Sequence, residues 1–211
     1  MHIFFDLDGT LTDPKEGFIA SIRFALSKLN IEIESDTNFE SYIGPPLQDT
    51  LRELCGNDAI AKDAVLLYRE RYSTTGLREN QIYDGISECL DQITGKAESI
   101  YVVTSKLAII AEQIIEQFKL SRYFKVVYGS NLDGSLSDKT ELIDHVLRSE
   151  GISPRNAVMI GDRSFDIIGA KNNGLDTIGV LWGYGSKDEL ICAGADELCQ
   201  HPNEIYDLIF T

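Results

Sequence analysis

The chain has 211 residues, 43% of them hydrophobic and 25% charged, which is enough to bury a core and fits one domain, alone or with a smaller insert. The formal net charge of -15 argues against a nucleic acid polymer as partner, because so acidic a surface repels the phosphate backbone. No apolar stretch approaches the roughly 18 residues that cross a bilayer, and Met1 leads straight into the first predicted strand, so we expect a cytoplasmic protein without a membrane partner.

The chain opens with a short apolar run that predicts a buried strand and ends at two carboxylates, Asp6 and Asp8. The next long region has no convincing strand. Instead, apolar residues recur there at helical spacing in three sets, at positions 18–29, 47–54 and 60–72. These sets predict a helical domain over residues 15–81, inserted into a second domain that comprises residues 1–14 and 82–211.

From residue 86 onward, apolar β-branched runs alternate with longer amphipathic runs. A helix at 86–93 leads to a strand at 99–105, and this alternation continues to a last strand at 176–183. Strand and helix in such succession predict a parallel sheet covered by helices, and continuously apolar strands indicate burial on both faces. The predicted fold class is therefore α/β, with a Rossmann-like parallel sheet, helices on both of its faces and an inserted all-helical domain.

Polar side chains follow several of these strands, where ligands collect in an open parallel sheet. They are Asp6 and Asp8 after the first strand, Thr104 and Ser105 after the strand at 99–105, and Asp162 and Asp166 after the run at 156–160, with Lys139 at the start of the helix before that run. Two carboxylates about 4 Å apart repel each other by about 4 kcal/mol at an effective dielectric constant near 20. A divalent cation reverses that sign, and Mg²⁺ prefers oxygen ligands while it retains several waters.

The same residues suit phosphoryl transfer. Asp6 has the chemistry of a nucleophile towards phosphorus, and Asp8 that of an acid which protonates the departing alkoxide and later accepts a proton from water. Lys139 adds a positive charge, and Thr104 with backbone N–H groups at the following helix start supplies donors for phosphate oxygens. The predicted phosphate-binding residues are Thr104, Ser105, Lys139 and Gly9.

Four motifs carry a resemblance to a known family: D-x-D-G-T at 6–10, Thr104 after an apolar strand, Lys139, and G-D-x-x-x-D at 161–166. In this order they resemble the haloacid dehalogenase superfamily, and its phosphoglycolate phosphatase-like branch in particular. The resemblance implies that the helical insert is a cap of the first type. It also implies that Asp6 is nucleophile and metal ligand, Asp8 acid/base and metal ligand through its main-chain carbonyl, Asp162 a metal ligand, and Asp166 its close support at the metal.

The resulting prediction is a Mg²⁺-dependent phosphatase that acts on a small phosphorylated metabolite, as a monomer or homodimer. Phosphoglycolate and a nucleoside 5′-monophosphate are the favoured substrates; Thr140 stands where many relatives have proline after the motif lysine, which weakens the assignment to phosphoglycolate. A phosphomutase of the β-phosphoglucomutase type and a non-catalytic metabolite-binding protein are the alternatives. We expect residues 183–185 to form a loop after the last long strand. Their spacing matches no phosphate-binding motif, so we do not expect them to bind phosphate.

Overall fold

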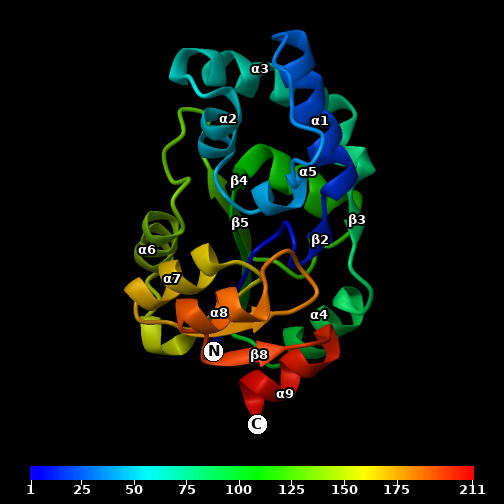
Figure 1. Cartoon of the computed structure of the whole chain (residues 1–211). Coiled ribbons are helices and arrows are strands. Elements are labelled where there is room, and N and C mark those ends of the chain that lie inside the picture. Colours follow the sequence, from blue (N-terminus) through cyan, green and yellow to red (C-terminus); the bar gives the residue numbers. More distant parts are fainter. The chain divides into compact units, whose positions relative to one another are not determined.

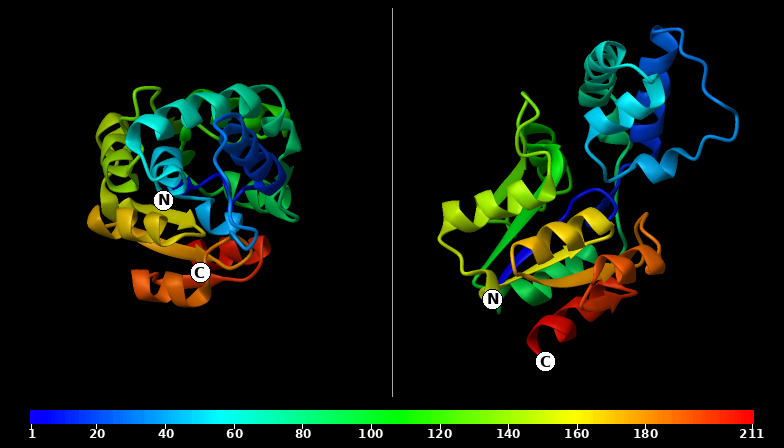
Figure 2. Two further views of the ribbon diagram at one scale, coloured as in Figure 1. Left: turned by 45° about the horizontal axis from the view of Figure 1, so that its top comes forward. Right: turned by 60° about the vertical axis from the view of Figure 1, so that its left-hand side comes forward.

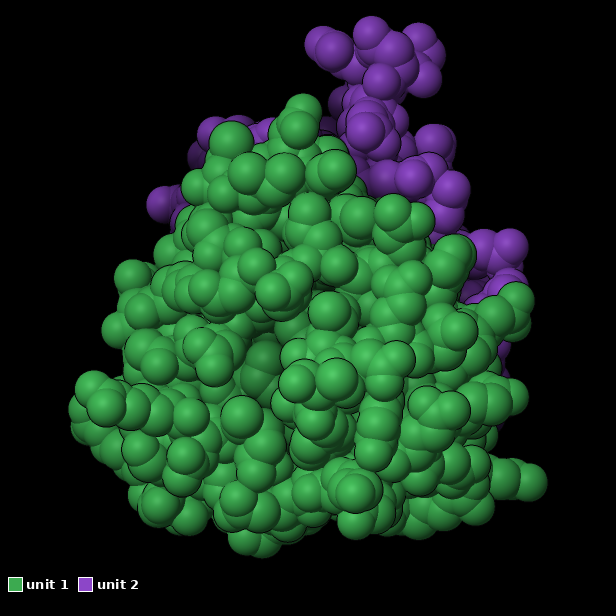
Figure 3. All heavy atoms as spheres, turned by 90° about the horizontal axis from the view of Figure 1, so that it is seen from below, with its two compact units in different colours: residues 1–13, 82–211 green, residues 14–81 purple.

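The computed structural model describes residues 1–211 and divides the chain into two compact units. Residues 1–13 and 82–211 form the core unit, and residues 14–81 form the helical unit; Figure 3 shows them in different colours. The predicted domains have their junctions at residues 14/15 and 81/82. No helix in the structure combines the length and the apolar character needed to span a membrane.

The core unit is built on a six-stranded parallel sheet in the order β5-β4-β1-β6-β7-β8 (Figure 1). Its strands are β1 (His2–Phe5), β4 (Ser99–Leu107), β5 (Val126–Ser130), β6 (Ala157–Gly161), β7 (Asp176–Val180) and β8 (Glu197–Cys199). The first strand of the chain lies at the centre, because His2 pairs with Ser99 on one side and with Ala157 on the other. The end of β1 therefore lies between the ends of β4 and β6.

Helices pack on both faces of this sheet (Figures 1 and 2). They are α4 (Ile86–Thr94), α5 (Ala108–Gln117), α6 (Lys139–Glu150), α7 (Ser164–Asn172), α8 (Lys187–Ala193) and α9 (Ile205–Phe210). One face carries Phe4, Tyr101 and Met159, which form a buried cluster with Leu142 and Val146 of α6. Because side chains alternate along a strand, the neighbouring residues face the opposite side, and both faces are buried. The predicted α/β class with a parallel sheet is confirmed.

The start of α6 is fixed by a side-chain cap. Asp138 accepts hydrogen bonds from the backbone N–H groups of Thr140 at 2.8 Å and Glu141 at 3.1 Å, which satisfies two donors that have no partner within the helix. Lys139 is the first residue of this helix and is 5% exposed. The cap therefore sets where the Lys139 side chain enters the core.

The helical unit contains α1 (Lys15–Lys28), α2 (Leu47–Cys55) and α3 (Asp58–Thr74). Helix α3 packs against both α1 and α2. Tyr68 and Tyr72, one turn apart on α3, are 6% and 2% exposed, with their rings stacked at a centroid distance of 5.2 Å. Both tyrosines belong to the core of this unit, as their helical spacing indicates.

Several elements were not predicted. Two-residue strands, β2 (Thr12–Asp13) and β3 (Gln81–Ile82), form a separate two-stranded sheet at the junctions of the inserted region, and α8, β8 and α9 complete the C-terminal part. Strand β4 also continues to Leu107, two residues beyond the predicted end of this strand at residue 105. Ser105 is a strand residue, in agreement with the predicted strand at 99–105.

Candidate active site

The turn after β1 places the motif carboxylates. The backbone N–H of Asp6 donates to the carbonyl of Ile160 in β6 at 2.9 Å, and the chain then turns tightly, with Leu11 and Thr12 both donating to the carbonyl of Leu7 at 2.9 Å. Gly9 within this turn has φ +87°, and a Cβ atom there would lie 2.3 Å from Oδ2 of Asp162. Only glycine fits this position, because a side chain would be strained and would also collide with Asp162.

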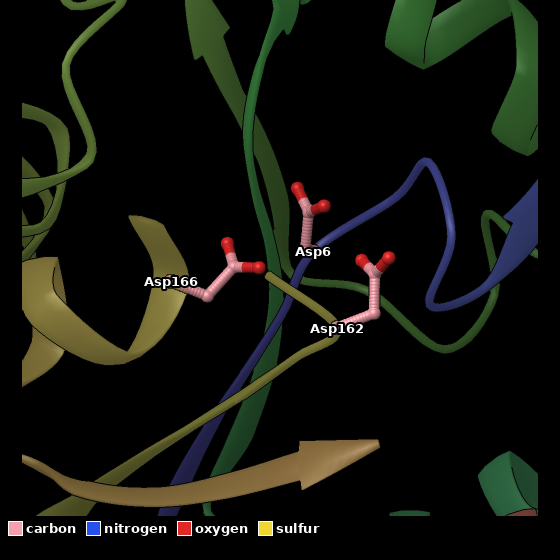
Figure 4. A group of neighbouring side chains, drawn as sticks. All are labelled: Asp6, Asp162 and Asp166. Carbon is pink, nitrogen blue, oxygen red and sulfur yellow. The ribbon is translucent and has the colours of Figure 1, made fainter. Parts of the chain in front are cut away.

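Three carboxylates gather at the carboxyl ends of β1 and β6 (Figure 4). Asp6 follows β1, Asp162 follows β6, and Asp166 lies in the first turn of α7; one oxygen of each lies within 4.8 Å of the others. All three are buried, with Asp162 fully inaccessible. Like charges so close and so poorly solvated repel strongly, so this cluster requires compensating positive charge.

Lys139 supplies part of that charge. Its Nζ lies 2.7 Å from Oδ1 of Asp6 and 2.6 Å from Oδ1 of Asp166, and it donates to the carbonyl of Val103 at 2.7 Å. Burial on its own lowers the pKa of Lys139, but Asp166 and Asp6 outweigh burial and leave that pKa raised, so the side chain is an ammonium at neutral pH. One ammonium against three carboxylates leaves two negative charges uncompensated.

The pKa values of the carboxyls reflect this excess. Burial, with repulsion from Asp166 and Asp6, raises the pKa of Asp162 well above its ordinary value. Burial also raises the pKa of Asp166 to about 6, although Lys139 opposes the shift. A divalent cation fits here, because it would offset two charges and would find hard oxygen ligands already gathered.

Two neutral donors hold Asp162. The backbone N–H of Tyr184 donates to its Oδ2 at 2.8 Å and the Thr10 hydroxyl donates to its Oδ1 at 3.2 Å. Gly183 packs so closely that a Cβ atom would lie 2.3 Å from the Cβ of Asp162. Residues 183–185 are a loop, as predicted, but sequence reasoning missed that this loop orients a carboxylate. The available signal was two glycines around an aromatic residue, shortly after the apolar run of a strand.

The extended end of β4 carries Thr104, Ser105 and Lys106. The pairing with β5 shifts register between Val103 and Leu107, and the Thr104 hydroxyl accepts a hydrogen bond from the backbone N–H of Lys106 at 3.3 Å. Thr104 is 2% exposed, whereas Ser105 is half-buried. Both lie near the carboxyl end of β4, which is the strand next to β1, so they lie at the same end of the sheet as Asp6.

Asp8 has different surroundings from Asp6. Its Oδ2 accepts a hydrogen bond from Nζ of Lys106, and its buried Oδ1 has no hydrogen-bond partner. Burial raises the pKa of Asp8, Lys106 opposes that shift, and the charge of Asp6 adds to it. The two carboxylates of the motif thus have different partners. Asp6 belongs to the three-carboxylate cluster, and Asp8 pairs with the ammonium of Lys106 from β4.

The sequence model of haloacid dehalogenase-like hydrolases matches residues 3–180. The chain belongs to this family. Among haloacid dehalogenase-like relatives, a 5′-nucleotidase of Pseudomonas aeruginosa is 48% identical over 190 residues, covering 90% of this chain and 86% of that protein. The tyrosine-protein kinase PtkA of Mycobacterium tuberculosis is 37% identical over 186 residues, and the match covers 88% of this chain but only 64% of the kinase.

Solved structures of the family agree with this fold. The crystal structure of a predicted phosphatase from Clostridium acetobutylicum has a TM-score of 0.94 at 39% identity, covering 99% of this chain and 97% of that one. The haloacid dehalogenase resemblance that the four motifs indicated is therefore confirmed. Relatives named a nucleotidase and a kinase nevertheless show that the family alone does not decide the reaction, which has to be argued from the site.

Proposed function

We propose that this chain is a Mg²⁺-dependent phosphomonoesterase that hydrolyses a small phosphorylated metabolite through an aspartyl-phosphate. The supporting observation is the separation of the two motif carboxylates. Asp6 is held by Lys139 in the cluster that needs a cation, whereas Asp8 lies outside that cluster with one oxygen unpartnered. A nucleophile has to stay ionised and an acid has to hold a proton, so the two roles require different surroundings.

In the first step, a carboxylate oxygen of Asp6 attacks phosphorus and the bond between phosphorus and the ester oxygen breaks. Asp8 gives its proton to that oxygen, so the alcohol leaves neutral. In the second step, Asp8 takes a proton from water as the water oxygen attacks the same phosphorus. The acyl phosphate bond then breaks, inorganic phosphate leaves, and the Asp6 carboxylate and protonated Asp8 are restored.

The metal-binding residues in this proposal are Asp6 and Asp162 through their carboxylates and Asp8 through its main-chain carbonyl, with Asp166 supporting them closely. When bound, a divalent cation would supply positive charge for the phosphate oxygens and would offset the excess of carboxylates. Lys139 orients Asp6 by donating a hydrogen bond to its Oδ1. Its three N–H donors already have acceptors in Asp6, Asp166 and the carbonyl of Val103, so we assign its effect on phosphate to charge.

Phosphate contacts are proposed for Gly9, Thr104 and Ser105 as well. Gly9 keeps the backbone next to Asp162 open, and Thr104 and Ser105 come from the strand beside β1. The helical insert, residues 15–81, is proposed to act as the cap that selects the substrate and excludes water from it. A nucleoside 5′-monophosphate is the first candidate substrate, because the relative named 5′-nucleotidase is 48% identical over nine-tenths of this chain. Phosphoglycolate is the second.

A hydrolysis panel tests this function. Purified protein with Mg²⁺ is offered nucleoside 5′-monophosphates, sugar phosphates and phosphoglycolate, and inorganic phosphate is measured. We expect release without a sugar bisphosphate activator; dependence on such an activator, with isomerised sugar phosphate as product, would identify a mutase instead. Transfer from ATP to tyrosine in place of hydrolysis would contradict the proposal.

Asp6→Asn is the matched variant for this panel. The amide is nearly isosteric with the carboxylate but is a poor nucleophile, so phosphate release should fall by about 10⁴-fold or more while the circular dichroism spectrum stays native. EDTA should abolish wild-type activity and Mg²⁺ should restore it, whereas excess Ca²⁺ should inhibit because it accepts more ligands at longer range. Full activity without metal would exclude the mechanism.

A further inference from the structure

Lys106 pairs with the second motif carboxylate across 98 positions of sequence, from the end of β4 to the turn after β1. We infer that Lys106 is a positioning residue, which holds Oδ2 of Asp8 so that Oδ1 is the oxygen that exchanges the proton with the leaving group and with water. This inference rests on the proposed phosphatase function and adds to it a residue that none of the four motifs includes. It assigns different tasks to the two oxygens of one carboxylate.

Two contacts fix Lys106 at its two ends. Its backbone N–H donates to the Thr104 hydroxyl at 3.3 Å, in the part of β4 where the register with β5 shifts. Its Nζ donates to Oδ2 of Asp8, and the two side chains are only 10% and 14% exposed. An ion pair so poorly solvated is geometrically specific, since neither charge has water to replace its partner.

The oxygens of Asp8 differ in their environment. Oδ2 has the ammonium, and the buried Oδ1 has no hydrogen-bond partner. A buried polar oxygen without a partner is costly, so Oδ1 is the atom that gains most from contact with an alcohol oxygen or a water. The other buried ammonium nearby, Lys139, is already bonded to Asp6 and Asp166 and does not replace Lys106.

A positioning role makes a kinetic prediction that differs from that of a substrate-binding role. Misplacing an acid slows departure of a poor leaving group, which needs the proton, much more than departure of a good one. KM should change little, because a positioning residue acts through Asp8 and does not bind the substrate. A lysine that bound the substrate would instead raise KM and leave kcat nearly unchanged.

The test compares Lys106→Met with Lys106→Arg, and uses Lys125→Met as the matched control. Lys125 also pairs with a carboxylate, Glu150 at 2.6 Å, but this pair involves the beginning of β5 and the end of α6. Single-turnover cleavage, with enzyme in excess, is measured for adenosine 5′-monophosphate, which leaves as an alkoxide, and for p-nitrophenyl phosphate, which leaves as a stabilised phenolate. Steady-state kcat and KM are measured for both.

For Lys106→Met we expect single-turnover cleavage of adenosine 5′-monophosphate to slow by about 10²-fold, as is usual when a catalytic group is displaced, with less than about tenfold loss for p-nitrophenyl phosphate. Lys106→Arg should recover part of the loss, since a guanidinium also pairs with a carboxylate. Lys125→Met should leave both rates unchanged. The stabilisation of the protein by Mg²⁺ should be the same in all variants.

Other outcomes overturn the inference. Equal slowing of both leaving groups, a raised KM with unchanged kcat, an arginine variant as slow as the methionine variant, or loss of the Mg²⁺ stabilisation would each show that Lys106 acts in another way. In those cases wild-type hydrolysis still stands, so the proposed function survives. If the wild-type protein releases no phosphate from any substrate of the panel, the proposed function and this inference both fall.

Discussion

The two ends of helix α6 carry charges of opposite sign, and these ends differ in whether neighbouring groups compensate the charge. Lys139 is its first residue and Glu150 its last, so each charge is placed against the preference of the helix dipole and has to be stabilised by partners. Glu150 accepts hydrogen bonds from Lys125 at 2.6 Å, Tyr128 at 2.7 Å and Tyr101 at 3.0 Å. One carboxylate thus meets one ammonium and two hydroxyls, and its charge is balanced.

The Lys139 end is not balanced. Its single ammonium faces Asp6 and Asp166, and Asp162 adds a third carboxylate to the same buried cluster. A protein selected for stability alone would gain from fewer charges there, because each extra buried carboxylate has to be desolvated and repels the others. The contrast indicates that the Glu150 end serves the fold, whereas the Lys139 end retains an unfavourable charge excess that the proposed catalysis would use.

Lys139→Met should have the largest effect on stability. Removing the ammonium leaves three buried carboxylates without a counter-ion, and breaking a buried pair in this way costs about 3–5 kcal/mol. Urea unfolding of the metal-free protein measures this loss. Lys125→Met, which removes a lysine that is 54% exposed, should cost much less, because ion pairs of exposed side chains contribute little to stability. Similar losses in both variants would contradict the contrast between the two ends.

Mg²⁺ should stabilise the folded protein by an intermediate amount, and this gain should depend on residues at the Lys139 end of α6 only. A ligand that binds only the folded state stabilises it by about 2.7 kcal/mol when present at one hundred times its Kd. Thermal unfolding after EDTA treatment, with and without MgCl₂, measures this gain. Asp162→Asn should lose most of the gain and Glu150→Gln should keep it. An equal gain in Asp162→Asn would show that the ion binds elsewhere.

Glu150→Gln should destabilise the protein less than Lys139→Met, by about 1–2 kcal/mol, because the amide keeps an acceptor oxygen and loses only the charge. Lys125 first, and then Tyr128, hold the pKa of Glu150 below its ordinary value. The contribution of Glu150 to stability is therefore complete above the unfolded pKa, about 4.3, and is lost as the pH falls through the lower folded pKa. Urea unfolding of wild type and variant from pH 7 downward should show their difference shrinking below about pH 4.3. A difference that is constant with pH would mean that the charge is not involved.

Much of the fold was predictable because the buried strands are continuously apolar. The elements that were missed are short: β8 has three residues, Glu197–Cys199, and α9 has six, Ile205–Phe210, too few for a period to appear. The end of β4 was misjudged for another reason. The predicted strand ended at Ser105, but strand pairing uses backbone groups, which the side-chain pattern does not show, and it continues to Leu107, which pairs with Ser130.

The difference between side-chain patterns and backbone contacts also explains which parts of the site the sequence predicted. Motif spacing identified Asp6, Lys139, Asp162 and Asp166, and the structure brings these four together. Motif spacing did not identify the hydrogen-bond donor of Tyr184, because that donor is a backbone N–H group and does not depend on the type of side chain. Nor did it show that Asp8 pairs with Lys106, since no local pattern encodes a contact across 98 positions.

The short β2–β3 sheet at the junctions has a consequence for the speed of folding. Strands β1 and β4 are neighbours in the central sheet, yet the inserted residues separate them widely along the chain. Once β2 and β3 have paired, the segment still to be closed between β1 and β4 falls from about 90 to about 25 residues, which lowers the entropic cost of closure by about 1 kcal/mol. The cost of closing the inserted segment is then met when β2 and β3 pair, and the centre of the sheet forms afterwards from strands separated by a much shorter segment.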